Sequence, residues 1–315
     1  MPATSADVAR LAGLSRATVS QVLNGHASRF AKDTAQRVIA AAAELGYEPS
    51  AAGRMLRRGS SDFVIALVPN TTFGGNLQNI FDTVTELLAE HGLTLVLRLS
   101  TQSPASLDRL LAGMRPQAVL SLQPFSDEER RVLDKHDVFA FDTSTGGDLN
   151  YEIGRIQAEH LVARGFKRLA FAHLRDTRED PYGGGREQAV VDVCARSGLP
   201  APVSFGLGID LTEAEDALGE LLPGVGIACY NDDIAITLMN AALSRGWSVP
   251  GDVGLIGMDN TPLSQVTRPR LTTVGYDQGA AARSTADAAL GVLNLTSSAT
   301  LPVDIDLRIM PGEST

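Results

Sequence analysis

Near its start the chain carries the hydrophobic spacing of a short amphipathic helix. Val8 and Leu11 lie three residues apart on one helical face, and Thr4 and Asp7 have the spacing of a capping box. Asp7 also places negative charge in the first helical turn, where it stabilises the helix dipole. We therefore predict a helix over about residues 5–12.

A second helix is predicted after a sharp turn at Gly13, with Ser15 as its cap and Asn24-Gly25 as its stop. Its inward positions fall at i, i+3 and i+4: Val19, Val22 and Leu23. Its outward positions are polar or small: Arg16, Ala17, Ser20 and Gln21. This pair of helices predicts a helix-turn-helix, whose second helix enters the major groove of DNA with its N-terminal residues leading.

A third helix is predicted between Asp33 and Leu45, where apolar residues again recur at helical spacing. These residues are Val38, Ile39, Ala42 and Leu45. The three helices would together close a small all-α core.

From residue 61 the pattern changes to short apolar runs, typical of buried strands, that alternate with helical stretches. We predict strands at 63–68, 93–99, 118–122, 138–141, 169–172, 203–207, 227–230 and 254–258, and a last strand near 303–309. We predict helices near 77–90, 106–114, 127–136, 152–164, 186–197, 212–222, 232–245 and 278–293. Two successive parallel sheets of this kind predict two doubly wound α/β lobes with a cleft between them.

Three segments of the N-terminal part resemble the DNA-binding headpiece of the lactose/galactose repressor (LacI/GalR) family of bacterial transcription factors. They are DVARLAG, SRATVSQVLNG and LGYEPSAAGRMLRRG. The resemblance implies that Arg16 and Ala17 read base edges and that Gln21 is a third contact position. It implies contacts to the phosphate backbone from Thr4, Ser15, Thr18, Ser20 and Asn24. The family usually has a capping Ser before the third helix, where this chain has Ala31, and losing that cap costs about 1 kcal/mol.

The resemblance also implies a domain organisation. Residues 1–48 would form the headpiece, 49–60 a hinge helix or linker, and 61–315 a two-lobed effector-binding and dimerisation domain similar to type I periplasmic sugar-binding proteins. Lobe 1 would comprise about 62–150 and 276–302, and lobe 2 about 151–275 and 303–311.

The segment 49–60 matches the family's hinge helix, which pairs with its twin in a dimer and inserts a leucine, here Leu56, into the minor groove. A helix of about nine residues is too short for independent stability, and Gly53 weakens it by roughly another 0.5–1 kcal/mol. We expect it to fold only on DNA, where Arg54 and Arg57 gain phosphate contacts. The alternative is a flexible basic linker without groove insertion.

Polar residues follow the predicted strands, at the sheet edge where ligands of such folds bind. They are Asp142, His173, Asn231 and Asp259. Carboxylates and amides there suit the hydroxyls of a sugar or another polyol. The resemblance implies effector contacts for Asp142, Arg186, Asn231 and Asp259, and Tyr276 is a candidate for stacking on a ring.

Other interpretations of these residues stay open. Asn231 and Asp259 could cap loops, Arg186 could be an exposed arginine of a first helical turn, and Tyr276 could be a core tyrosine. Gly183-Gly184-Gly185 is interpreted as a mobile loop, because no Lys-Ser/Thr follows as in a phosphate cradle.

Charge separates the two parts of the chain. The whole chain carries −10, but residues 1–60 hold eight Arg/Lys against four acids, or +4, which leaves −14 on the remainder. Attraction to phosphate therefore belongs to the headpiece. Cys194 and Cys229 have no metal-ligand spacing and are expected to be reduced, and no signal peptide or membrane-spanning run is found, so we expect a cytoplasmic protein without cofactor or metal.

These observations predict a homodimeric transcription regulator, a repressor rather than an enzyme, that binds a pseudo-palindromic operator under control of a small-molecule effector. A sugar or sugar derivative is the expected effector, and a nucleoside or purine is the alternative. The alternative functions are a cytoplasmic solute-binding protein and an α/β enzyme using Asp259 or His173, for which no nucleophile elbow or dinucleotide fingerprint is found. No apolar heptads follow Ile309, so a coiled-coil tetramerisation tail is not expected.

Overall fold

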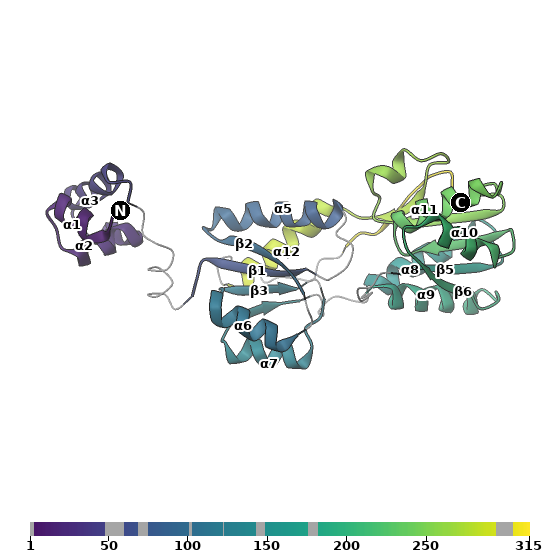
Figure 1. Cartoon of the computed structure of the whole chain (residues 1–315), viewed down its shortest axis with the longest axis horizontal. Helices are drawn as coiled ribbons and strands as arrows, with labels where there is room; N and C mark the ends of the chain where they lie inside the picture. Colours follow the sequence, from purple (N-terminus) through teal and green to yellow (C-terminus); the bar gives the residue numbers. More distant parts are fainter. Residues whose placement is uncertain are drawn as a thin grey trace.

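The structure is a computed structural model that describes residues 3–47, 60–68, 75–100, 103–121, 123–142, 149–175, 182–293 and 305–315. It contains an all-α headpiece followed by two α/β lobes (Figure 1). The hinge residues Arg54, Leu56 and Arg57, and Gly53 between them and the headpiece, lie outside the described residues.

The headpiece has the three predicted helices. They are α1 (Ser5–Ala12), α2 (Arg16–Gln21) and α3 (Lys32–Glu44), with a π-helical turn at Val22–His26 and a 3-10 turn at Ala27–Arg29 between α2 and α3. Val8, Val19, Val22 and Val38 are buried together between the helices. The α-helical part of the second helix ends at Gln21, and the predicted left-handed Gly25 (φ 87°) interrupts the π turn that follows.

The prediction that Leu11 and Ile39 lie on the inner faces of their helices is wrong. Leu11 is 47% exposed and Ile39 is 54% exposed. On α1 the buried face is formed by Val8, Ala9 and Ala12, and at 100° per residue Leu11 lies roughly 100° away from its centre. Small alanines thus complete this core. A prediction that looks only for large apolar side chains therefore misplaces the buried face of the helix.

Lobe 1 is a four-stranded parallel sheet with the order β2-β1-β3-β4. Its strands are β1 (Phe63–Val68), β2 (Thr94–Leu99), β3 (Ala118–Ser121) and β4 (Phe139–Phe141), and its helices are α5 (Gly75–Glu90), α6 (Pro104–Met114) and α7 (Asp127–Lys135). Alternate residues of β1 serve opposite faces. Val64 and Ala66 pack against α5, and Ile65 and Leu67 pack toward α6 and α7.

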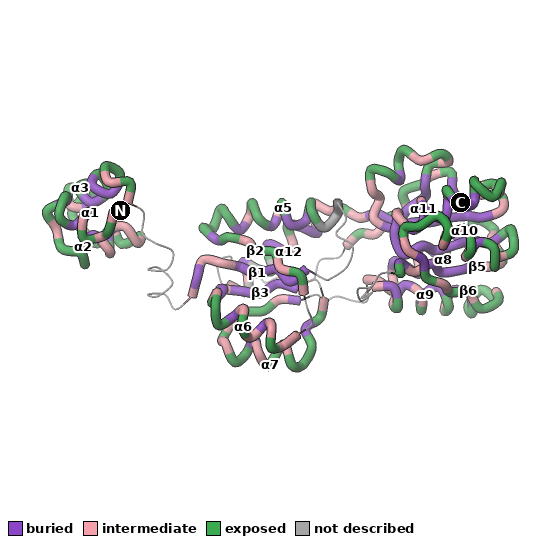
Figure 2. Tube along the Cα trace, viewed as in Figure 1, coloured by how far each residue is buried: buried purple, intermediate pink, exposed green. Residues whose placement is uncertain are grey.

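Lobe 2 is a six-stranded sheet with the order β10-β9-β8-β7-β5-β6, parallel except for β10. Its strands are β5 (Leu169–Leu174), β6 (Val203–Leu207), β7 (Val225–Cys229), β8 (Val253–Met258), β9 (Thr272–Gly275) and β10 (Arg308–Met310), and its helices are α8 (Leu149–Ala163), α9 (Gly183–Arg196), α10 (Leu211–Gly219) and α11 (Asp232–Ser244). Helices α8 and α9 cover one face and α10 and α11 the other. Figure 2 shows the buried strands enclosed by helices that are exposed on their outer sides.

The connection between the lobes includes a strand that the sequence pattern did not predict. The strand β9 belongs to the sheet of lobe 2, whereas α12 (Gln278–Val292) packs with α5 on lobe 1. Only Tyr276 and Asp277 lie between these two elements, and Asp277 accepts a hydrogen bond from the backbone N–H of Ala280 at the start of α12. Of the strand predicted near 303–309, residues 303 and 304 lie outside the described residues, and from residue 305 onward the strand is observed at Arg308–Met310.

In the described part of the chain, no helix is both long and apolar enough to cross a membrane. The same residues contain no group of three or more His, Cys, Asp or Glu side chains that could hold a metal ion. Cys194 and Cys229 are free and buried.

Candidate functional site

The first helix of the headpiece is fixed by its cap. The hydroxyl of Thr4 accepts a hydrogen bond from the backbone N–H of Asp7, and the Asp7 carboxylate accepts one from the backbone N–H of Thr4 at 3.0 Å. Arg10 forms an ion pair with the same carboxylate. Thr4 is exposed, so its position also permits the phosphate contact that the resemblance implies.

The second helix presents its N-terminal end to solvent. Ser15 caps it by accepting the backbone N–H of Thr18 at 3.0 Å. Val19 anchors its inner side and is fully buried, and the three residues assigned to base reading, Arg16, Ala17 and Gln21, are all exposed. The helix thus offers a guanidinium, a methyl group and an amide on one accessible face.

The remaining candidate phosphate contacts are engaged in part within the headpiece. The Ser15 and Thr18 hydroxyls are 2.9 Å apart, and the Asn24 amide donates to the backbone carbonyl of Ser20. Thr18, Ser20 and Asn24 are each half-buried. These contacts fix the direction of the polar groups along α2.

The sequence interpretation missed the role of Arg37 in this unit. Its guanidinium donates to the backbone carbonyl of Ala12 at 2.6 Å, and so ties α3 to the turn of the helix-turn-helix. That carbonyl comes next to Gly13, whose φ of 66° is left-handed. Arg37 is the one arginine within α3, and this was the feature of the sequence that could have pointed to its role.

In lobe 2 the carboxyl ends of the strands bring Arg186 and several aromatic rings together. Arg186 is only 7% exposed, which excludes the interpretation as an exposed first-turn arginine. Its Nε donates to the Asn150 side-chain oxygen at 3.2 Å, and its Nη1 donates to the backbone carbonyl of Tyr230. The guanidinium lies 5.0 Å from the ring centre of Tyr230 and 5.9 Å from that of Tyr182.

The three glycines before Arg186 are not the loop that was predicted. Gly183, Gly184 and Gly185 form the first turn of α9, and Gly183 is buried. The helix packs against α8 so closely that a Cβ on Gly154 would lie 2.2 Å from the Arg186 carbonyl oxygen. Backbone contact between α8 and α9 thus sets the position of Arg186.

Asn231 follows β7 and caps α11. Its side-chain oxygen accepts the backbone N–H of Ile234 at 3.1 Å, so the capping interpretation describes this oxygen. The next residue, Asp232, is fully buried and was missed by the sequence interpretation, although it stands beside Asn231 in the run Asn231-Asp232-Asp233. Burial raises the pKa of Asp232 to about 6.

Asp259 follows β8 in an unusual backbone conformation. Asp259 and Asn260 have φ of 104° and 49°, a region that residues other than glycine rarely adopt. The buried carboxylate of Asp232 fixes this loop, because it accepts hydrogen bonds from the backbone N–H of Thr261 at 2.7 Å and from the hydroxyl of Thr273 at 2.6 Å. Strained backbone of this kind is typical of ligand sites.

Tyr276 and Tyr182 share the electrostatic surroundings of Asp259 and Arg186. Burial and, to a smaller extent, the Asp259 charge raise the pKa of Tyr276 to about 12, and Arg186 acts in the opposite direction. Burial likewise raises the pKa of Tyr182, with smaller contributions from Tyr230, Arg186 and Asp259. Tyr276 also packs against the buried cluster between the sheet and α8, so the core interpretation is part of its role.

Two candidate residues lie apart from this group. His173 is inside β5, where its Nε2 is 3.1 Å from the Glu187 carboxylate and its ring meets that of Phe171 edge-on at 4.6 Å. Asp142 lies in lobe 1, is 6% exposed, and accepts the Arg130 guanidinium at 2.6 Å and the backbone N–H of Phe125 at 2.8 Å. Asp142 therefore shapes lobe 1 around Phe125.

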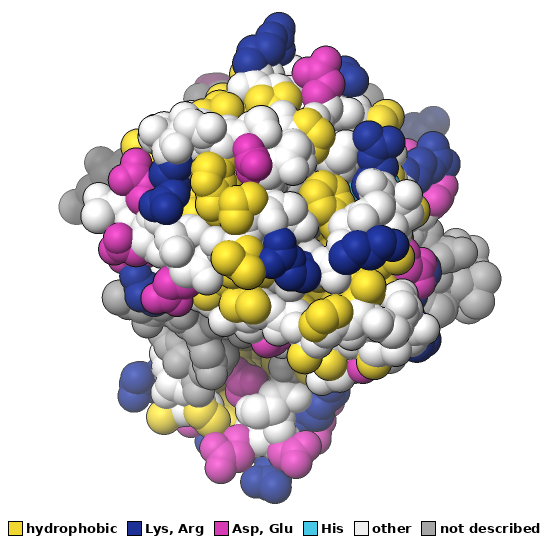
Figure 3. Space-filling model, turned by 90° about the vertical axis from the view of Figure 1, so that its right-hand side faces the viewer, with side chains coloured by type: hydrophobic (Ala, Val, Ile, Leu, Met, Phe, Trp, Pro, Cys, Tyr) yellow, Lys and Arg dark blue, Asp and Glu magenta, His cyan; other side chains and the backbone are white. Residues whose placement is uncertain are grey.

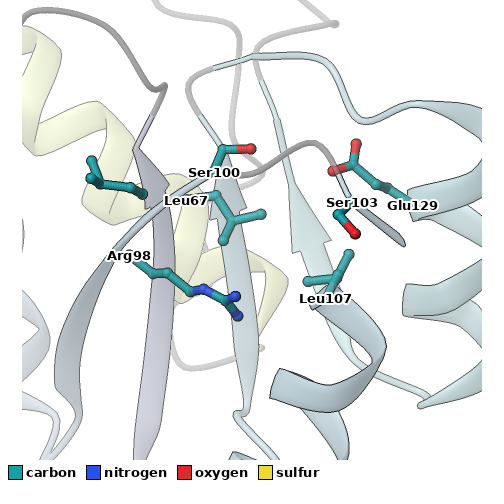
Figure 4. Close-up of a pocket in the computed structure, with 7 residues that line it drawn as sticks. Leu67, Arg98, Ser100, Ser103, Leu107 and Glu129 are labelled. Carbon is teal, nitrogen blue, oxygen red and sulfur yellow. The ribbon is translucent and has the colours of Figure 1, made fainter. Parts of the chain in front are cut away.

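Lobe 1 has a cavity of about 410 Å³ at the carboxyl ends of its strands. It is lined by Leu67, Ser100, Ser121, Gln123, Pro124, Phe125, Ser126 and Glu129. A smaller hollow, whose lining residues Figure 4 shows, shares Leu67, Ser100 and Glu129 with it. Both lie at the edge where ligands of parallel sheets bind.

Two family models match the chain. The model of bacterial regulatory proteins of the lacI family matches residues 4–50, and that of a periplasmic binding protein-like domain matches residues 158–315. Among curated proteins, the HTH-type transcriptional regulator GntR of Pseudomonas aeruginosa is 32% identical, over 98% of this chain and 94% of its own length. The regulator GalR of Escherichia coli is 30% identical, over 92% of this chain and 89% of its own length.

Solved structures share the fold. The lac repressor dimer bound to operator and the anti-inducer ONPF matches with a TM-score of 0.81 at 20% identity, covering 100% of this chain and 99% of the other. A complex of the transcriptional regulator CelR with cellobiose matches with a TM-score of 0.67 at 22% identity, covering 99% of this chain and 100% of the other. The headpiece and both lobes thus have counterparts in one known architecture.

Proposed function

Because this chain belongs to the lacI family of DNA-binding transcription regulators, we propose that it is a homodimeric repressor whose operator affinity is set by a small molecule bound at the lobes. The relatives are regulators rather than enzymes, and the headpiece at residues 4–50 distinguishes the chain from a solute-binding protein. The observation that carries the proposal is one chain holding both an exposed α2 face and a polar sheet edge around Arg186.

The exposed face of α2 supports operator reading. Arg16 can donate two hydrogen bonds to a guanine, which is worth roughly 1–3 kcal/mol of discrimination, and the Ala17 methyl can contact a thymine methyl. Ser15 and Thr18 lie at the start of the same helix and are suited to phosphate contacts. Arg16 is thus expected to carry most of the base discrimination.

The carboxyl edges of the two sheets support effector binding. Arg186 and Asp259 on lobe 2, and the cavity of about 410 Å³ on lobe 1, offer polar groups to a ligand of sugar size. The matched CelR structure contains cellobiose, which favours a sugar or sugar derivative. A nucleoside or purine is the competing class, because Tyr182 and Tyr276 offer rings for stacking.

Coupling between the two ends would pass through residues 49–60. We expect this segment to fold as a helix on the operator and the effector to alter the spacing of the two copies in a dimer. Since coupling of two binding equilibria is reciprocal, operator DNA must change effector affinity by the same factor.

Exposed apolar side chains on lobe 2 support self-association. Leu263 and Val266, in and beside the 3-10 turn Pro262–Gln265, are 61% and 67% exposed. Figure 3 shows hydrophobic side chains interspersed with charged ones over the lobe 2 end of the molecule.

The proposal is tested by selecting a binding site from random duplex DNA and titrating it with the full chain at several salt concentrations. We expect a pseudo-palindromic site, binding that weakens steeply with salt, and a loss of roughly 5- to 150-fold for each half-site in R16A. R245Q is the control and should bind the selected site normally, because Arg245 lies at the C-terminal end of α11 in lobe 2. A selected site without dyad symmetry, or wild-type affinity in R16A, would contradict the proposal.

A further inference from the structure

The guanidinium of Arg186 is a buried charge with only neutral partners. Its residue is 7% exposed, and its hydrogen bonds go to the side-chain oxygen of Asn150 and the backbone carbonyl of Tyr230. In the described ranges, no carboxylate oxygen lies within 4.0 Å of it. A buried charge without an opposite charge is strongly unfavourable unless a ligand supplies one.

Other buried charges of this chain are treated differently. Asp142 has the Arg130 guanidinium at 2.6 Å, and Asp232 accepts hydrogen bonds from Thr261 and Thr273. Asp142 is thus compensated by an opposite charge, and Asp232, whose partners are neutral, can lose its charge by taking up a proton. Arg186 differs because its partners are neutral and a guanidinium stays charged.

One nitrogen of Arg186 is accessible. Nη2 makes no hydrogen bond to the described groups. Among these groups, the one side-chain N or O atom that is both fully buried and without a partner is Oε1 of Gln157, so Nη2 is not fully buried. It therefore reaches open space. The rings of Tyr182 and Tyr230, at 5.9 and 5.0 Å, flank the guanidinium and limit the directions of approach.

The start of α9 adds positive potential at the same place. Arg186 is the fourth residue of this helix of 14 residues, and Tyr182 at its cap position makes no side-chain capping hydrogen bond. The backbone N–H groups of a first turn carry the positive end of the helix dipole. A first turn made of three glycines allows a ligand to approach that backbone closely.

A negative charge, that of Asp259, also acts on two tyrosines that Arg186 influences, Tyr182 and Tyr276. Asp259 and Arg186 influence the pKa of Tyr276 and of Tyr182 in opposite directions, so both charges are near these two rings. Among the described residues, no ion pair within 4.0 Å joins Arg186 to Asp259. The site therefore combines the guanidinium of Arg186, flanked by the rings of Tyr182 and Tyr230, with the carboxylate of Asp259 on the loop after β8.

We propose that the effector is an anion: a hydroxylated molecule whose carboxylate or phosphate binds Arg186 and whose hydroxyl groups donate to Asp259. This inference rests on the proposed function in placing the effector at the edge of lobe 2. An anion compensates the buried guanidinium with charge-assisted hydrogen bonds, which a neutral sugar cannot do. Sugar acids and sugar phosphates share this chemistry.

The test compares matched ligands on the full chain by thermal shift and calorimetry. D-glucose and D-galactose are compared with their uronates and 6-phosphates, and with inorganic phosphate and acetate as minimal anions. We expect an anionic member to raise the Tm and to bind at least about tenfold more tightly than its neutral parent. The uronate and phosphate arms distinguish the two sources of negative charge.

Two outcomes of this comparison overturn the inference. One is a neutral sugar that binds as tightly as its anionic counterparts. The other is a Tm that stays unchanged with every anion, inorganic phosphate included. Added salt supplies a further measure, because it should weaken binding of the anion more than binding of a neutral sugar.

Variants locate the site. R186Q removes the charge and should weaken anion binding by at least about tenfold, whereas R186K retains the charge without the planar fork and should lie between R186Q and wild type. R245Q is the matched control, since Arg245 also stacks on a ring, that of Trp247 at 5.7 Å, but is exposed. Undiminished anion binding by folded R186K and R186Q would assign the anion to another site and refute the inference.

Operator titrations separate this inference from the function on which it rests. An anion that binds through Arg186 without altering operator affinity keeps the anion site at Arg186 and contradicts effector control by that ligand. A neutral sugar that alters operator affinity keeps effector control and contradicts the inference.

Discussion

The carboxylate of Asp232 holds the hydroxyl of Thr273 at 2.6 Å, and this contact joins the first turn of α11 to β9. The same carboxylate accepts the backbone N–H of Thr261 at 2.7 Å, so it also fixes the loop that carries Asp259. Gly257 makes room for it, because a Cβ there would lie 2.1 Å from the Asp232 oxygen. One buried carboxylate therefore supports two of the segments that border the proposed effector site.

Asp232 should make stability depend on pH. Burial raises its pKa to about 6 from 3.8, so between these values the folded state keeps a proton that the unfolded state has lost. Stability from this group is therefore highest below about pH 4 and decreases as the pH rises to about 6, by about 1.4 kcal/mol per unit. The free energy of unfolding of wild type minus that of D232N, measured by urea denaturation, should fall over this interval.

The control for this measurement is Asp252, an ordinary carboxylate whose pKa is lowered by hydrogen bonds from the Ser248 backbone N–H and hydroxyl. Its contribution is lost only as the pH falls below 3.8, so the corresponding difference for D252N should stay level between pH 4 and 6. A level difference for D232N as well would show that Asp232 ionises as it does in water.

Replacing Gly154 by alanine should destabilise lobe 2. The added Cβ would lie 2.2 Å from the Arg186 carbonyl oxygen, and that atom is backbone and cannot rotate away. We expect a loss of roughly 1–3 kcal/mol in the free energy of unfolding, together with a displaced α9 and weaker effector binding. In G113A the new methyl meets no atom within 4 Å, so stability should rise by roughly 0.5–1 kcal/mol. Equal stability of G154A and G113A would contradict the close packing of α8 and α9.

A serine at position 31 should stabilise the headpiece. Ala31 is at the cap position of α3 in an extended conformation, and no side chain caps this helix. In A31S the hydroxyl can accept a free backbone N–H of the first turn, which is worth about 1 kcal/mol. The matched control is A40S, on the exposed side of the same helix, which should lower stability slightly. Thermal unfolding followed by circular dichroism on the headpiece transition distinguishes the two, and a lower Tm for A31S would refute the cap.

Replacing Gly53 by alanine should strengthen operator binding if residues 49–60 fold on DNA. Alanine favours a helix over glycine by roughly 0.5–1 kcal/mol, and a dimer has two such segments. Each copy should thus contribute roughly a two- to fivefold gain in affinity, measured by fluorescence anisotropy with the selected operator. Unchanged or weaker binding by G53A would favour the flexible linker.

The alternation of apolar runs was enough to predict most elements of both lobes. The strand Phe63–Val68 has the predicted bounds, and the helix at Asp127–Lys135 differs from its prediction by one residue. These predictions succeed because the apolar side chains that set the pattern are the ones that are buried. The strand Thr272–Gly275 was missed. Its threonines are fully or almost fully buried and its hydroxyls bind Asp232 and the C-terminal residues, so side-chain contacts distant in sequence replace apolar patterning there.

Site residues were predicted less completely than the fold. Arg186 and Asp259 could be named from motifs, but the rings around the guanidinium come from Tyr182 and Tyr230, which are 48 residues apart in the chain and are joined only by the packing of α9 against the sheet. The helical start at Gly183 was also not predictable from local propensity, since glycine disfavours helices. Tertiary packing overrides that preference here.

The two-residue connection at Tyr276 and Asp277 leaves almost no slack between the sheet of one lobe and a helix of the other. Any pivoting of the lobes must be absorbed by very few backbone torsions at this joint, and Tyr276 places its ring in the electrostatic reach of Arg186 and Asp259. A molecule that contacts the Tyr276 ring would therefore act directly on the connection about which the lobes rotate. The same side chain would then both recognise the ligand and transmit its binding to the angle between the lobes.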